Sequence, residues 1–138
     1  MSKSAESTLA ELFAAAKAAH ANAYAPYSRF KVGAALRTPS GVISTGCNVE
    51  NAAYPQGSCA EAGAIAAMAL AGERRIAEIL VVGDGAALCT PCGGCRQRIR
   101  EFADPATLIH IAGPQGVRRT FTLAKLLPES FGPDHLAV

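Results

Sequence analysis

The sequence lacks any apolar run long enough to cross a membrane. Its longest uncharged apolar stretch extends from Ala62 to Gly72, well short of the roughly 20 residues that span a bilayer. The N-terminal segment carries Glu6 and Glu11 inside its apolar pattern, which the hydrophobic region of a secretory signal would not tolerate. We therefore expect mature, soluble structure from the N-terminus onward, a cytoplasmic location and no membrane partner.

The sequence also lacks a concentration of basic residues. Thirteen Lys and Arg against eleven Asp and Glu give a net charge of +2, and the basic residues form only short clusters such as Arg118-Arg119. With neither a polybasic tail nor an aromatic stacking platform, we expect no nucleic-acid partner.

No repeat or linker is visible, and half of the residues are apolar. Residues 1–138 are therefore expected to form a single domain with a sizeable core.

An even set of cysteines, as a complete disulfide framework needs, is missing too. The five cysteines are Cys47, Cys59, Cys89, Cys92 and Cys95. Because the count is odd and no secretory signal is evident, we expect reduced thiols, which favours metal binding or catalysis.

Hydrophobic periodicity and turn signals predict a layered α/β domain. Helices are expected over residues 5–24, 58–71, from 92 through the segment RQRIREFA, and in a short piece at 123–127. Strands are expected over residues 30–38, 42–50, 77–84, 107–113 and 117–122. This alternation of helices and strands is typical of a sheet covered by helices.

Two of the expected helices begin with cysteine. Cys92 and Cys95 stand three apart, so both sulfurs would lie on one face of a first turn, where unpaired amides and the helix dipole favour thiolate. Cys59 follows Ser58 at the start of another expected helix and would feel the same influence. Two helix starts that converge at one sheet edge would offer three thiolates to one cation. Zinc binds such a tetrahedral set and, in catalytic sites, keeps water in the fourth position.

Glu61 lies two residues after Cys59 and offers a carboxylate that need not be a ligand. Such a group can take a proton from zinc-bound water and return it to a leaving group. Other interpretations stay open, because Ser58-x-x-Glu61 also matches a capping box. The C-x-x-C pair also fits a redox pair, or half of a structural zinc site completed by Cys59 and either Cys47 or Cys89.

A family resemblance rests on these motifs and on three further segments. C-A-E followed by P-C-G-G-C-R-Q resembles the zinc-dependent nucleoside and nucleobase deaminases, with cysteine in place of histidine as in the small cytidine deaminases. The segments AYAPYSRFKVGAAL, GCNVENAAYP and LLPESF are similar to segments of free cytidine deaminases, so the resemblance covers nearly the whole chain. It implies an α/β fold, a three-layer α/β/α sandwich with a five-stranded mixed sheet, and one catalytic domain over residues 1–138. It also implies one Zn²⁺ per subunit, held by Cys59, Cys92 and Cys95.

The activity implied by the resemblance is a hydrolysis in pyrimidine salvage. Cytidine and deoxycytidine would become uridine and deoxyuridine with release of ammonia, through attack of zinc-bound hydroxide at C4 while Glu61 moves the protons. A deaminase of another small aminopyrimidine nucleoside and a non-catalytic zinc-stabilised binding module are the alternatives.

The same resemblance assigns substrate contacts. Phe30 is expected to line the pyrimidine pocket, and backbone groups near Ala60 to contact the base. Asn48 and Glu50 are expected to hold the ribose hydroxyls, and their donor and acceptor groups suit a diol.

Two aromatic residues carry an implication about assembly. Tyr54 and Phe131 match family residues that reach the site of a neighbouring subunit. The resemblance therefore implies a homotetramer with active sites shared between subunits.

Ala62 departs from the family pattern. Many members have an arginine directly after C-A-E, hydrogen-bonded to the cysteine ligands, where it draws off part of the thiolate charge. Backbone amides at the two helix starts can supply part of this compensation. Arg96, directly after Cys95, is the nearest fixed positive charge in sequence, and we expect it to help the amides.

Overall fold

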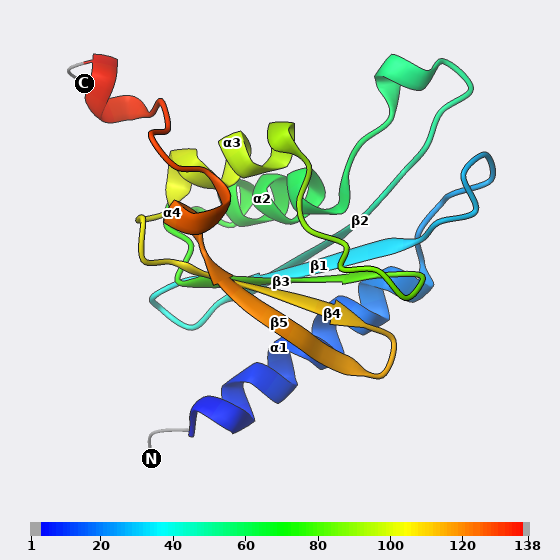
Figure 1. Ribbon diagram of the computed structural model, residues 1–138, viewed down its shortest axis with the longest axis horizontal. Coiled ribbons are helices and arrows are strands. Elements are labelled where there is room, and N and C mark those ends of the chain that lie inside the picture. The colour runs from blue at the N-terminus through cyan, green and yellow to red at the C-terminus, as the bar shows by residue number, and fades with distance from the viewer. Residues whose placement is uncertain (1–3, 137–138) are drawn as a thin grey trace.

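The protein folds as one five-stranded sheet with helices on both faces (Figure 1). Its structure, a computed structural model, describes residues 4–136. The elements in chain order are α1 Ala5–Ala21, β1 Val32–Arg37, β2 Ile43–Cys47, η1 Tyr54–Gln56, α2 Ala60–Leu70, β3 Glu78–Gly83, α3 Gly93–Phe102, β4 Leu108–Gly113, β5 Gly116–Thr122, α4 Leu123–Leu126 and η2 Pro133–Leu136. The predicted order of helices and strands is confirmed.

The sheet is mixed, as predicted. Its strands lie in the order β2-β1-β3-β4-β5. β3 and β4 are parallel, whereas the other neighbouring pairs are antiparallel. A right-handed crossover is the usual geometry for a helix joining two parallel strands, and α3 occupies that connection between β3 and β4.

Two apolar clusters fill the space between the sheet and its helices. Successive strand residues point to opposite faces, so Leu80 packs in the cluster that contains Leu12 of α1, whereas Val81 packs in the cluster that contains Met68 of α2 and Ile99 of α3. Figure 1 shows α1 on one face of the sheet and α2 and α3 on the other. The three-layer prediction is confirmed.

The start of α2 differs from the prediction. The Ser58 amide donates to the Val49 carbonyl at 2.9 Å, which holds Ser58 in a strand-like bridge. Cys59 therefore becomes the N-cap, with no side-chain capping bond, and α2 begins at Ala60. Because the Ser58 amide is already paired with Val49, the capping-box interpretation of Glu61 is wrong.

Gly46 of β2 lets α2 lie directly on the sheet. A Cβ atom at Gly46 would stand 2.4 Å from the Ala60 carbonyl oxygen and 2.4 Å from the Ala64 amide nitrogen. No side chain fits there without moving the helix. The absence of a Cβ at residue 46 therefore sets where α2, and Cys59 before it, lie on the sheet.

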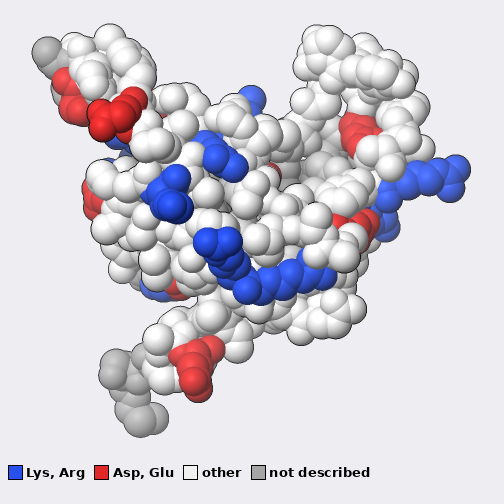
Figure 2. Space-filling model, viewed as in Figure 1, with Lys and Arg blue, Asp and Glu red and all other residues white. Residues whose placement is uncertain are grey.

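Two arms project from this body. One carries η1, between β2 and α2, and the other carries the C-terminal segment with η2 (Figure 1). Figure 2 shows the surface hollowed between the η1 arm and the body, and charged side chains scattered over the same face. Within residues 4–136, no helix has the length and apolar character needed to cross a bilayer.

Candidate metal centre and substrate cavity

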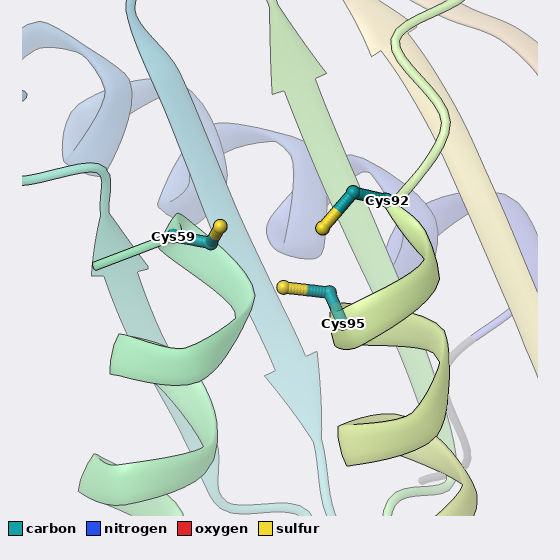
Figure 3. A group of neighbouring side chains, drawn as sticks. All are labelled: Cys59, Cys92 and Cys95. Carbon is teal, nitrogen blue, oxygen red and sulfur yellow. The ribbon is translucent and has the colours of Figure 1, made fainter. Parts of the chain in front are cut away.

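Three sulfur atoms meet where α2 and α3 begin. Cys59 is the N-cap of α2, Cys92 is the N-cap of α3, and Cys95 lies in the first turn of α3. Their Sγ atoms all lie within 4.8 Å of one another. Figure 3 shows the three side chains pointing toward a common point from the two helix starts.

The geometry of this cysteine triad fits zinc. Thiolates are preferred zinc ligands, and in a tetrahedral shell with Zn–S bonds of about 2.3 Å neighbouring sulfurs lie roughly 3.8 Å apart. A small closure of the observed arrangement would reach that spacing. Neither Cys47 nor Cys89 belongs to the cluster found among the described residues, so the geometry favours three protein ligands and an open fourth position over a structural four-cysteine site.

The surroundings of the sulfurs differ. A hydrogen bond from the Cys95 amide lowers the pKa of Cys92, as expected at a helix start. Burial instead raises the pKa of Cys59 and of Cys95, so the expected influence of the helix start does not prevail at these two thiols. A bound cation reverses this balance because its charge favours thiolate. The three sulfurs thus form a ligand set whose thiolate form a bound cation would stabilise.

Glu61 lies beside the triad in the first turn of α2 and is only 4% exposed. Burial raises the pKa of its carboxyl, opposed by a hydrogen bond from its own amide and by the charge of Arg98. The side chain lines the same cavity as Cys59 and Cys92. A proton-accepting group thus lies next to the metal ligands, on the side where a small molecule can enter.

The cavity next to the triad has a volume of about 260 Å³. Its lining residues are Phe30, Val32, Asn48, Cys59, Ala60, Glu61, Cys89, Thr90 and Cys92. The structure thus brings three of the predicted substrate-binding residues, Phe30, Asn48 and Ala60, to the candidate metal site. The Phe30 ring lies against Gly83 and Gly85, where an added Cβ would be 3.5 and 3.6 Å from ring carbons.

Asn48 holds the wall of this cavity together. Its Oδ1 accepts a hydrogen bond from the Val32 amide at 2.9 Å, and its Nδ2 donates to the Phe30 carbonyl at 2.8 Å. The side-chain amide still has one N–H and one lone pair for another partner. Asn48 therefore fixes the backbone that carries Phe30 and can also bind a ligand.

Glu50 lines a second hollow rather than the metal cavity. This hollow has a volume of about 380 Å³, and Tyr27, Ser28, Glu50, Asn51, Tyr54 and Gly57 line it. Glu50 accepts hydrogen bonds from the Ser28 hydroxyl and from the Ser28 and Tyr27 amides. The Ser28 side chain contributes most to lowering the pKa of Glu50. The carboxylate is therefore held ionised as an acceptor.

The two aromatic residues predicted to serve a neighbouring subunit lie on the two arms. Tyr54 is 77% exposed, and its ring meets Tyr27 edge-on at 6.1 Å. Phe131 is 55% exposed and stacks on His135 at 5.2 Å. Phe131 is not among the residues that line the cavity of its own chain.

Sequence reasoning did not place Cys89 and Thr90 in the cavity wall, or Ser28 beside Glu50. The signal for Cys89 and Thr90 was their position in the loop that leads into Cys92, since residues next to a ligand in a loop tend to share its site. Ser28 stands inside the quoted P-Y-S-x-F segment, but only the folded loop shows that its hydroxyl meets Glu50.

Arg96 does not contact the sulfurs, so the prediction that it helps to offset the thiolate charge is wrong. The Arg96 guanidinium donates to the Pro91 and Leu126 carbonyls, both at 2.7 Å, and to the Thr90 hydroxyl at 3.2 Å. These bonds tie the loop before α3 to α4. The arginine that meets a sulfur is Arg98, whose Nη1 lies 3.6 Å from Cys95 Sγ.

Known proteins share this fold and these motifs. The family model described as the cytidine and deoxycytidylate deaminase zinc-binding region matches residues 6–111. A cytidine deaminase of Sporosarcina psychrophila is 40% identical over 127 residues, which cover 92% of this chain and 93% of that protein. A cytidine deaminase of Mycobacterium tuberculosis is 42% identical over 118 residues, 86% of this chain and 85% of that protein.

Solved structures agree with these sequence relatives. The crystal structure of cytidine deaminase from Burkholderia pseudomallei has a TM-score of 0.83 and 45% identity, covering 88% of this chain and 98% of that one. Cytidine deaminase from Mycobacterium tuberculosis has a TM-score of 0.76 and 39% identity, covering 89% and 96% of the two chains. With the cysteine triad in place at the converging helix starts, the chain belongs to the cytidine and deoxycytidylate deaminase zinc-binding family.

Proposed function

We propose that this protein hydrolyses cytidine and deoxycytidine to uridine and deoxyuridine with release of ammonia. One observation carries the proposal: Cys59 and Cys92 of the cysteine triad line one small cavity together with the buried Glu61 carboxyl. The relatives named cytidine deaminase support the same substrate class.

Glu61 is the proposed proton carrier. Zinc bound by the triad supplies Lewis acidity, which makes water a stronger nucleophile near neutral pH. Glu61 takes a proton from the attacking water and delivers it to N3 of the base as the C4–O bond forms. It then moves the proton of the new C4 hydroxyl to the departing amine, and the C4–N bond breaks as C4=O forms. General acid–base groups contribute in this way when they lie within hydrogen-bond reach of the reacting atoms.

The substrate contacts follow from the two hollows. We assign the base to the cavity of Phe30 and Ala60, where an aromatic face and backbone groups are available. Asn48 lines this cavity and keeps a free donor and acceptor, and Glu50, two residues further along the chain, lines the second hollow. We assign the sugar hydroxyls to these two residues. Ionised Glu50 accepts hydrogen bonds from hydroxyls.

We also propose that the active protein is a homotetramer whose subunits share active sites. Exposed aromatic side chains are enriched in interfaces between subunits. Tyr54 and Phe131 are exposed on projecting arms, and Phe131 does not line the cavity of its own chain. A neighbouring copy would give both residues a partner surface.

We propose a cytoplasmic location and a role in pyrimidine salvage. All five cysteines are unpaired, and free thiols are typical of reducing compartments. Uridine and deoxyuridine are products that nucleoside-salvaging reactions can use.

The experiment that tests the proposed function follows the ultraviolet absorbance of cytidine during turnover. We expect conversion by the zinc-loaded protein, loss of activity after chelation, and recovery when zinc is returned. Absence of cytidine conversion by protein with one zinc per chain would reject the proposal and favour the non-catalytic zinc module.

A panel of substrates separates cytidine from other aminopyrimidines. If Asn48 and Glu50 bind the sugar, free cytosine should react with a much lower kcat/KM than cytidine. Equal rates with cytosine would mean that the sugar is not recognised and would favour another small aminopyrimidine as substrate.

A further inference from the structure

Arg98 contacts a sulfur of the triad from the surface of α3. Its Nη1 donates to Cys95 Sγ at 3.6 Å. The two residues are three apart on the helix, a spacing that places side chains next to each other. Cys95 is fully buried whereas Arg98 belongs to the exposed face of α3. The guanidinium thus reaches inward from solvent to a buried ligand atom.

The helix surface leaves a path for this side chain. Arg98 Nη1 lies 3.3 Å from the position that a Cβ of Gly94 would occupy. Because residue 94 has no side chain, the guanidinium can fold back along the helix over Gly94 and approach Cys95. A larger residue at position 94 would press on the arginine.

The other two arginines of α3 are held elsewhere. Arg96 bonds to the loop before α3 and to Leu126, and Arg100 bonds to Ser130 and Asp134. Arg98 is therefore the arginine of this helix that contacts the triad.

Three thiolates and one Zn²⁺ carry a net charge of −1. A hydrogen bond from a cationic donor is stronger than one from a neutral donor, and it reduces the negative charge on the sulfur. Ala62, directly after Glu61, offers no such donor, so a cationic donor to the sulfurs has to come from another position.

We propose that Arg98 is a positioning residue for the zinc site, which orients the Cys95 sulfur and offsets part of the charge of the zinc–thiolate centre. The proposal rests on zinc being the bound cation and does not require that cytidine be the substrate. Residues that hydrogen-bond to metal ligands typically change metal affinity by about 10- to 100-fold. Because the Arg98 contact is long and partly exposed to solvent, the lower end of this range is expected.

The test measures the zinc dissociation constant by competition with a chromophoric chelator, in the absence of substrate. Arg98→Ala should weaken zinc binding by roughly 10-fold, and Arg98→Lys should bind zinc more tightly than Arg98→Ala because it keeps the charge. Arg75→Ala is the charge-matched control. It removes an arginine whose partner is Asp104, beyond the C-terminal end of α2, and should leave zinc affinity unchanged.

A second variant moves the positive charge to the neighbouring helix. Ala62→Arg placed in the Arg98→Ala background should restore much of the lost zinc affinity, because α2 and α3 both begin at the triad. The melting temperature of each zinc-free variant is measured alongside. It should stay close to that of the parent, since Arg98 contributes little to the core.

Two results would overturn the proposal. One is a zinc dissociation constant of Arg98→Ala equal to those of the parent and Arg75→Ala. The other is equal weakening in Arg98→Ala and Arg98→Lys together with a lower melting temperature of the zinc-free proteins, which would assign Arg98 to folding alone. Failure of the proposed deaminase function would be recognised separately, because the parent protein would then bind zinc but not convert cytidine.

Discussion

Replacing Gly46 with alanine should damage the metal site without touching any ligand. The added Cβ would lie 2.4 Å from two backbone atoms of α2, which is 1.0 Å short of the 3.4 Å at which ordinary contact begins. Both obstructing atoms belong to the first turns of a helix, so no side-chain rotation relieves the clash. The start of α2 must therefore move away from β2 by about 1 Å.

Two effects of this displacement can be estimated. Overpacking of a close interface costs about 1–3 kcal/mol of unfolding free energy, which corresponds to a fall in melting temperature of roughly 4–12 °C for a chain of this size. Metal–ligand distances tolerate changes of only about 0.2 Å, so a shift of Cys59 by several times that amount should weaken zinc binding by at least roughly 10-fold.

The loss of stability is measured by thermal unfolding of the zinc-free protein. The loss of zinc affinity is measured by competition between the zinc-loaded protein and a chelator. Gly63→Ala is the matched control, because it faces the same interface from the helix side and its Cβ would lie 3.4 Å from Gly46 Cα. It should alter stability by less than about 1 kcal/mol, in the stabilising direction, since alanine favours a helix over glycine. Unchanged melting temperature and zinc affinity in Gly46→Ala would show that α2 is not positioned by this contact.

Three further outcomes are expected. Alanine at any cysteine of the triad should abolish stoichiometric zinc binding in metal analysis, whereas Cys47→Ala and Cys89→Ala should keep one zinc per chain. Full zinc occupancy after loss of a triad cysteine would contradict the ligand assignment. Glu61→Gln should retain zinc but lose about 10²- to 10⁴-fold in kcat, because an amide cannot carry the proton, and a normal kcat would remove Glu61 from the mechanism. Phe131→Ala and Glu61→Gln proteins, each with little activity alone, should regain activity when their subunits are exchanged. Merely additive activity after verified exchange would argue against shared sites.

The order of the elements and the metal ligands could be predicted from the sequence because both depend on local patterns. The β-branched run of β3 and the helical periodicity of α1 each indicate their element within a single segment. The C-x-x-C spacing likewise forces Cys92 and Cys95 onto one face of a helical turn. Cys59 comes from a different helix than Cys92 and Cys95. Its position directly before a predicted helix was again a pattern within a single segment.

Details that depend on how segments meet could not be read in this way. Ser58 and Glu61 match a capping box locally, but the Ser58 amide is taken by Val49 from another segment. Asn48 and Glu50 stand close together in the sequence but line different hollows, and their joint role in binding a sugar stays a prediction. Each of these arrangements depends on residues outside the motif itself.

The contact between Arg98 and Cys95 shows most directly which features the local sequence predicted and which the folded structure decided. Local patterns in the sequence determined the five strands of an α/β domain and the Cys92–Cys95 pair at a helix start, because hydrophobic period, turn residues and ligand spacing are properties of short segments. The family resemblance added Cys59 as the third ligand and Glu61 as the proton carrier. The sequence also suggested Arg96 as the compensating charge, since Arg96 is adjacent to Cys95 along the chain. Successive helix residues point about 100° apart, so the side chain three positions on is the one that lies beside Cys95. Only the tertiary structure decided that Arg96 is held away from the sulfurs, because its guanidinium donates to the Leu126 carbonyl of α4, whereas Arg98 keeps its contact with Cys95 Sγ.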